Sequence, residues 1–315
     1  MNLKEKTMIR FPRLAAALAL VFVISFLSSI LAKPLPKDQT PPTASQKVPS
    51  VKVGLFAIGL ETYWGQFPGL LARLQGYQKE IQDGLASARA DVIDAGMVDN
   101  IDKARRAAAL FRQSGARLIF LYVSTYALSS TVLPVVQEAK VPVIVLNLQP
   151  KKAIDYGWFN GLGDRGKMTG EWLAFCQACS IPEIGNIFNR AAISFHLVTG
   201  TLEDPDAWRE IAEWTEAARV ADVMAQNRLG ILGHYYSGML DVYSDPTLQS
   251  VFFGTAIVHV EIGELKSLRD QVTEKEIAAK TVEMNKEFDI LPECPRDEVR
   301  RAARTACALD RLVEA

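Results

Sequence analysis

The sequence predicts an α/β protein built from two successive Rossmann-like units with parallel sheets, the second of them incomplete. From residue 51 onward, short apolar runs alternate with amphipathic helical patterns. This alternation is typical of parallel strands with helices on both faces of the sheet. After Glu261 the remaining pattern is helical, so the second unit has only two convincing strands, and a sheet of that size does not stand alone.

The first unit is predicted to span residues 51–226. Apolar runs predict strands at 51–58, around 90–93, and at 117–123, 141–148 and 193–198. Helical patterns cover 67–86, 101–114, 131–139 and about 205–226. The last helix begins at Asp204-Pro205-Asp206, because acidic residues and a proline are favoured in a first turn.

The second unit is predicted at residues 227–315, with strands at 228–232 and 256–260 and helices at 265–272, 274–288 and 296–314. The first of these strands runs into the turn GHYYSGM at 233–239. Its two glycines allow a sharp turn and a close approach of a ligand to the backbone. Since ligands of open α/β sheets bind at loops that follow strands, we expect function at this turn.

The N-terminus is predicted to direct export. Lys4, Lys6, Arg10 and Arg13 precede an apolar run at 14–32 that is long for a cleaved signal and just long enough to span a bilayer. Residues 1–32 are therefore a signal peptide or a membrane anchor, and both possibilities stay open. The proline-rich residues 33–50 are predicted to be a linker. The rest of the chain is expected in the periplasm, free or anchored to the inner membrane.

The charge balance excludes one class of partner. The 35 basic and 36 acidic residues leave a net charge of −1, so nothing indicates a nucleic-acid-binding protein. Contact with a membrane is expected only through the N-terminal segment.

Four cysteines, at 176, 179, 294 and 307, include one CxxC pair. Such a pair suggests a redox or zinc site, but zinc would need a second Cys or His pair nearby. We favour the interpretation that Cys176 and Cys179 are two small apolar residues at a helix end, although export would permit a bridge.

Four blocks carry a resemblance to a known family: VGLFAIGLETYWG at 53–65, NLQP at 147–150, FHLVTG at 195–200 and the turn at 233–239. In their joint order they resemble the L-arabinose isomerase family, within the wider L-fucose/L-arabinose isomerase group, from about residue 51 to the end. The resemblance implies an aldose–ketose isomerase of carbohydrate metabolism that acts on a pentose or hexose, usually with Mn²⁺. It also implies a homo-oligomer whose sites combine parts of two subunits.

The residues expected to bind substrate come from the resemblance and from the turn at 233–239. They are Glu61, Tyr63, Trp64, Tyr126, Asn147, Gln149, His234 and Met239. Each also has a structural interpretation: Tyr63 and Trp64 could anchor the following helix to the sheet, and Glu61 could cap its first turn. Because Glu61 and Asn147 depart from the commoner family identities, the identity of the sugar stays open.

No catalytic or metal-binding residue is predicted in this chain. The family holds its metal with two glutamates and two histidines, and by matching order this chain ends before the first of them. Its only histidines are His196, His234 and His259, without a glutamate at ligand spacing on a shared helix face. Mn²⁺ is therefore not expected to be fully coordinated by this chain.

Two hypotheses follow. The first is an L-arabinose isomerase-like protein whose metal-binding catalytic half is lost or separately encoded. The alternative is a non-catalytic exported sugar-binding protein of the periplasmic binding protein type, with its ligand in a cleft between two lobes. The alternative requires a complete second sheet, which the helical pattern after Glu261 does not favour.

Overall fold

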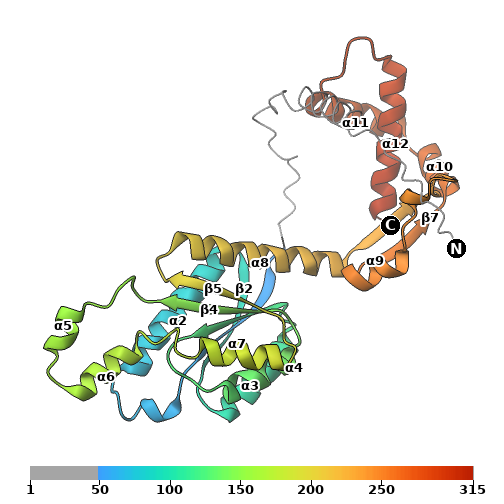
Figure 1. Cartoon of the computed structure of the whole chain (residues 1–315). Helices are drawn as coiled ribbons and strands as arrows, with labels where there is room; N and C mark the ends of the chain where they lie inside the picture. Colours follow the sequence, from blue (N-terminus) through green and yellow to red (C-terminus); the bar gives the residue numbers. More distant parts are fainter. Residues whose placement is uncertain (1–48, 315) are drawn as a thin grey trace, which may run out of the picture. The chain divides into compact units, whose positions relative to one another are not determined.

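The computed structural model describes residues 49–314, and the predicted α/β class is confirmed (Figure 1). The predicted signal or anchor lies outside the described residues, as does nearly all of the linker. Within residues 49–314, no helix has both the length and the apolar character that crossing a membrane requires.

The first unit contains a sheet of five parallel strands in the order β2-β1-β3-β4-β5. The strands are β1 (Val51–Ile58), β2 (Ala90–Val98), β3 (Leu118–Val123), β4 (Val143–Gln149) and β5 (Phe195–Thr201). This is the flavodoxin-like order of doubly wound sheets, in which the direction of winding reverses between β1 and β3. Ligands of such sheets bind at the carboxyl ends of the strands beside that switch point.

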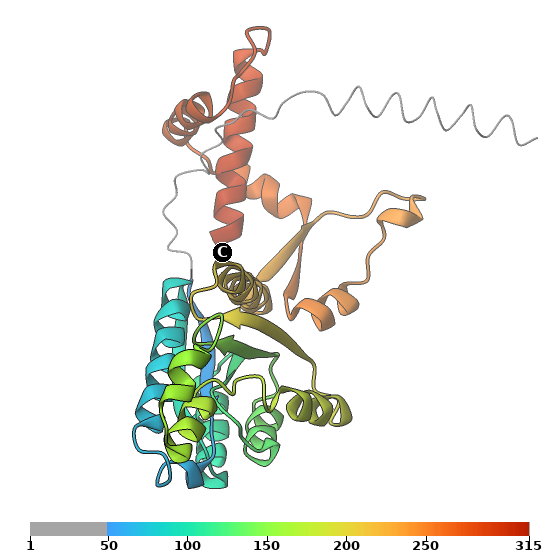
Figure 2. The ribbon, with the colours of Figure 1, turned by 60° about the vertical axis from the view of Figure 1, so that its left-hand side comes forward.

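Helices cover both faces of this sheet (Figure 2). One apolar core joins the strands to α2 (Leu70–Ser87) and α8 (Pro205–Gln226). A second core joins the opposite face to α3 (Ile101–Ser114), α4 (Ser129–Ala139) and α7 (Ile181–Arg190). The strands are buried from both sides, which explains why their sequences are nearly continuous apolar runs.

Local signals account for the helix boundaries. The predicted bounds of α3 are confirmed, because Asn100 caps its first turn by accepting from the Lys103 N–H at 2.9 Å and Gly115 ends it with φ 72°. The prediction that the first helix starts at residue 67 is wrong. Gly69 has φ 85°, a left-handed conformation that cannot continue a helix, so α2 starts at Leu70. Upstream, the short 3₁₀ helix η1 (Glu61–Tyr63) follows β1.

Strand β2 is longer than the 90–93 predicted. An irregularity in the pairing with β1 occurs between Leu55 and Ala57, and opposite it Gly96 has φ 71°. The Gly96 N–H donates to Asp94 Oδ1 at 2.8 Å, which supports this local distortion. Pairing resumes beyond it, so the strand extends to Val98 and carries the next residue, Asp99, to the carboxyl edge of the sheet.

The connection from β4 to β5 contains three helices that the sequence patterns did not reveal. They are α5 (Tyr156–Gly161), α6 (Arg165–Leu173) and α7. The first two are short, and their N-caps Asp155 and Asp164 accept backbone N–H groups at 3.0 and 2.7 Å. Helices this short show little periodicity, and the caps were the sequence signals that marked them.

The second unit contains a parallel pair of strands with the predicted bounds, β6 (Arg228–Leu232) and β7 (Ala256–Val260). Between them lie η2 (Leu240–Val242) and α9 (Pro246–Phe253), and β7 is followed by α10 (Ile262–Asp270), α11 (Glu274–Glu287) and α12 (Arg296–Glu314). The last three helices share a small apolar core around Ile277 and Ala303. The predicted incomplete sheet followed by helices matches the described part of this unit.

Candidate functional site

The predicted site residues of the first unit gather at the carboxyl edge of the five-stranded sheet. The switch point lies there, because the loop after β1 leads to α2 on one face and the loop after β3 leads to α4 on the other. We call this group the sheet-edge cluster. Its members are Glu61, Tyr63 and Trp64 after β1, Tyr126 after β3, and Asn147 and Gln149 at the end of β4.

Glu61 and Trp64 are bound to residues that follow β2. The indole Nε1 of Trp64 donates to Asp99 Oδ2 at 2.8 Å, and Lys103 Nζ approaches the same oxygen at 2.7 Å. The Asp99 side chain is fully buried, and its Oδ1 has no partner within the described part of the chain. Glu61 Oε1 accepts from the Asn100 amide at 3.2 Å. The Trp64 N–H therefore already donates to Asp99 and is not available to a ligand. The ring is half-buried, so its exposed part can contact a ligand.

Tyr63 and Tyr126 belong to the segments that follow β1 and β3, two neighbouring strands of the sheet. Burial raises the pKa of the Tyr63 phenol, and the neighbouring Tyr126 raises it further. Tyr63 also packs edge-on against Phe67, with ring centroids 5.9 Å apart. Tyr126 is 38% exposed. At neutral pH the Tyr63 hydroxyl stays protonated, so it can donate a hydrogen bond to a ligand beside the Tyr126 ring.

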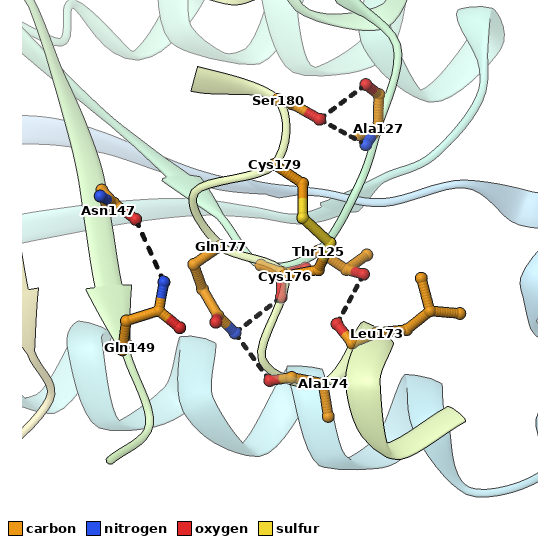
Figure 3. The surroundings of a disulfide bond; sticks show 11 residues. Thr125, Ala127, Asn147, Gln149, Leu173, Ala174, Cys176, Gln177, Cys179 and Ser180 are labelled. Atoms are coloured by element: carbon orange, nitrogen blue, oxygen red, sulfur yellow. Dashed lines mark hydrogen bonds between the residues drawn. A yellow bond between two sulfur atoms is a disulfide. The ribbon is translucent and has the colours of Figure 1, made fainter. Parts of the chain in front are cut away.

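Asn147 and Gln149 form a loosely held amide pair on β4 (Figure 3). Gln149 Nε2 lies 3.5 Å from Asn147 Oδ1, and Asn147 Nδ2 lies 3.4 Å from the Thr199 hydroxyl on β5. Both distances are at the long end of the hydrogen-bond range. These amides can therefore exchange such contacts for the hydroxyl groups of a ligand.

Sequence reasoning missed the residues that fix the end of β3. Ser124 donates to the Ile58 carbonyl at 2.7 Å, and Thr125 donates to the Leu173 carbonyl at 2.8 Å. Gln177 donates to the carbonyls of Ser124 and Ala174 at 3.0 and 2.9 Å (Figure 3). The position of Ser124 and Thr125 directly after a buried strand was a usable signal, whereas Gln177 lies in a loop that no sequence pattern links to β3.

The interpretation of Cys176 and Cys179 as unbridged is wrong, because the structure joins them in a disulfide (Figure 3). The loop between α6 and α7 brings their Cα atoms to 5.2 Å, within the range that a disulfide spans. Cys176 is buried and Cys179 is exposed. Next to the bridge, Ser180 Oγ accepts from the Ala127 N–H at 2.8 Å and donates to the Ala127 carbonyl at 2.9 Å. The bridged loop is thereby tied to the loop after β3.

The donor groups of residues 49–314 do not fit the Mn²⁺ that the resemblance implies. Among these residues, no group of three or more His, Cys, Asp or Glu side chains is arranged to hold a metal ion. His196 instead pairs with Glu210 at 2.5 Å and stacks near Trp214, which joins β5 to α8. We therefore derive no chemical step through a metal.

His234 and Met239 belong to the turn after β6 in the second unit. The two glycines of this turn adopt the left-handed conformation expected of them, with φ 79° at Gly233 and 89° at Gly238. His234 is exposed, and Met239 is 46% exposed. Their proposed role in ligand binding concerns this turn by itself, separate from the sheet-edge cluster.

Comparison with known proteins shows a partial similarity to a sugar isomerase. No family model matches the chain. A stretch of 132 residues is 28% identical to the L-arabinose isomerase of Acidothermus cellulolyticus (strain ATCC 43068 / DSM 8971 / 11B). The match covers 40% of this chain and 26% of that enzyme, so the chain spans about a quarter of its length. It supports a distant, sugar isomerase-like relationship.

Proposed function

We propose that this chain is a distant relative of the aldose–ketose sugar isomerases and that it binds a pentose or hexose at the sheet-edge cluster. One observation carries the proposal. The residues of the first unit that the resemblance assigns to the sugar lie in separate stretches of sequence, and the parallel sheet brings them to its carboxyl edge, where the switch point lies and where sheets of this topology bind ligands.

The side chains of the cluster suit a sugar. The rings of Tyr63 and Tyr126 offer apolar faces for the C–H groups of a pyranose or furanose, and the Tyr63 hydroxyl is a donor. Asn147 and Gln149 each offer one amide acceptor and two donors, which match hydroxyl groups that both donate and accept. Trp64 holds the loop after β1 in place through Asp99.

Several further properties belong to this proposal. We propose a homo-oligomer, as in the family that the chain resembles, and export by the basic and apolar N-terminal segment. His234 and Met239 are proposed as sugar contacts of the second unit. Turnover is not part of the proposal, because the described donor groups do not fit the metal.

We do not propose the alternative of a two-lobed solute-binding protein. That architecture needs a second complete sheet, with the ligand between two lobes. In residues 49–314 the second sheet consists of β6 and β7, and only helices follow it.

The proposal is tested by calorimetric titration of the full-length chain with L-arabinose, D-xylose and D-glucose. We expect saturable binding of at least one sugar. Tyr126→Ala and Asn147→Ala should each weaken it about fivefold, the equivalent of one lost hydrogen bond or ring contact of about 1 kcal/mol.

Phe288→Ala is the matched control, because this ring is 62% exposed at the end of α11, outside the first unit. Its affinity should equal that of the parent chain. Absence of saturable binding for all three sugars, or unchanged affinity in both cluster variants, contradicts the proposal.

A further inference from the structure

An ion pair between α2 and α6 lines two pockets of the first unit. Arg73 Nη1 lies 2.6 Å from Glu171 Oε2, and both side chains are about two-thirds to three-quarters buried. One pocket, of about 520 Å³, lies on the side of Phe67 and Lys167. The other, of about 450 Å³, lies on the side of the loop after β4, and both are in the size range of small-molecule sites.

The guanidinium of Arg73 is held in place from several directions. Its Nε donates to the Tyr77 hydroxyl at 2.7 Å, and its Cζ lies 5.9 Å from the Tyr77 ring and 5.6 Å from the Phe175 ring. Together with Glu171, these contacts fix the planar donor group before any ligand arrives. Such preorganisation lowers the entropic cost of binding.

The pocket beside the loop after β4 combines charged groups with aromatic rings. Its lining includes the charged residues Arg73, Lys151, Asp155 and Glu171 and the aromatic residues Trp158 and Phe175. Residues 151–155 lie in the loop after β4, which leaves the carboxyl edge of the sheet, where parallel sheets bind ligands. Trp158 is 53% exposed, so its ring is available to a ligand.

The charges of this lining balance, which argues for an uncharged ligand. Arg73 and Lys151 are cationic, and Asp155 and Glu171 are anionic. A ligand with a net charge would meet as much repulsion as attraction. An uncharged ligand with many hydroxyl groups can instead donate to the carboxylates, accept from the cations, and lay an apolar face on Trp158.

We propose that this pocket binds a neutral, polyhydroxylated ring of monosaccharide size. The site goes beyond the proposed function, because it shares no lining residue with the sheet-edge cluster. In this site the ring of Trp158 packs against the apolar face of the ligand. The Arg73–Glu171 pair forms hydrogen bonds with the hydroxyl groups of the ligand.

The test titrates the full-length chain with three sugars of different charge: neutral L-arabinose, anionic D-galacturonate and cationic D-glucosamine. We expect L-arabinose to bind most tightly. Trp158→Ala should weaken L-arabinose binding at the pocket about five- to tenfold through the loss of ring contact. Trp172→Ala is the control, because Trp172 is similarly exposed on α6 but does not line the pocket.

A second variant tests the charge argument. Glu171→Gln leaves the Arg73 charge unbalanced. The affinity for D-galacturonate should therefore rise about tenfold relative to the affinity for L-arabinose, which is the contribution of one charge-assisted hydrogen bond. Circular dichroism of each variant establishes that it is folded. The proposal is overturned if the Trp158 variant keeps the parent affinity, or if the Glu171 variant keeps the parent preference.

The results also separate this pocket from the sheet-edge proposal. Weaker L-arabinose binding in Trp158→Ala, with parent affinity in Tyr126→Ala and Asn147→Ala, supports the pocket and contradicts the sheet-edge site. The reverse pattern overturns the pocket alone. Two binding events, each removed by its own variants, support both sites. No binding of L-arabinose, D-galacturonate or D-glucosamine overturns the pocket, whereas the sheet-edge site is overturned only if D-xylose and D-glucose also fail to bind.

Discussion

Trp64 donates its indole N–H to Asp99 at 2.8 Å, and this bond joins the loop after β1 to the end of β2. The two residues are neighbours because β2 pairs with β1 on the side away from β3. Gly59 allows the ring to lie where it does, since a Cβ at that position would be 2.8 Å from the indole. Trp64 therefore has a structural role that is independent of any ligand.

Trp64→Phe should destabilise the protein. Phenylalanine retains most of the apolar contact but leaves the buried carboxylate of Asp99 with Lys103 as its remaining partner. Hydrogen bonds to charged groups contribute about 1.5 to 3 kcal/mol, so we expect a loss of about 2 kcal/mol in the free energy of unfolding. Urea denaturation measures it. Trp172→Phe, at an exposed position, should change stability little, and equal losses in the two variants would contradict the assignment.

Two glycines of α2 should respond to alanine in opposite directions. A Cβ on Gly84 would lie 2.2 Å from the ring of Trp208, which a 2.7 Å bond from its Nε1 to the Leu202 carbonyl holds in place. Gly84→Ala is therefore expected to lower the free energy of unfolding by about 1–3 kcal/mol. Gly76 has no atom within 4 Å of such a Cβ, so Gly76→Ala should stabilise the helix by about 0.5–1 kcal/mol. Thermal denaturation of both variants measures the difference, and changes of the same sign would show that α2 and α8 do not pack this way.

Loss of the disulfide should lower stability modestly. The bridge between Cys176 and Cys179 closes a very short loop. For such a loop, the loss of chain entropy in the unfolded state stabilises the folded protein by about 2 kcal/mol. We expect the free energy of unfolding of Cys179→Ser, measured by urea denaturation under oxidising conditions, to be lower than that of the parent by about this amount. Dithiothreitol should destabilise the parent chain but leave the variant unchanged. Cys294→Ser, which removes an exposed free thiol, should match the parent; if dithiothreitol affects parent and Cys179→Ser alike, the bridge does not form.

Acid should weaken the first turn of α11, and its ion pair with α12, through Glu276. The Thr273 hydroxyl and backbone N–H donate to this carboxylate at 2.6 and 2.7 Å, and Arg311 approaches it at 2.5 Å. These bonds, with Thr273 foremost, lower the pKa of Glu276 from its ordinary 4.5 to about 2. A lowered pKa in the folded state means that the stabilisation is fully present above pH 4.5 and is lost as the pH falls toward 2.

The measurement is the thermal midpoint of the parent and of Glu276→Gln across that pH window. The variant lacks the titrating group, so its midpoint should fall less steeply with acid than that of the parent. Glu287→Gln is the control, because Glu287 forms no ion pair among residues 49–314, and it should follow the parent curve. If the thermal midpoints of the parent and of Glu276→Gln fall in parallel with pH, Glu276 is not the cause of the acid destabilisation.

The sequence by itself determined the fold class and the features that depend on neighbouring residues. Alternating apolar runs and amphipathic patterns predicted parallel strands between helices, and the bounds of α3, β6 and β7 were predicted to the residue. These signals are local: a cap such as Asn100, a left-handed glycine such as Gly115, and the periodicity of side chains along one element.

Only the tertiary structure decided which of these elements meet. Periodicity says which face of an element is buried but not which strand lies beside it, so the order β2-β1-β3-β4-β5 was not predictable. That order sets Trp64 against Asp99, and the packing of α2 beside α6 sets Arg73 against Glu171, 98 residues away. The disulfide followed from the path of the loop between α6 and α7, which brings two Cα atoms to 5.2 Å. Contacts between distant segments depend on how whole elements pack, and no window of sequence contains that information.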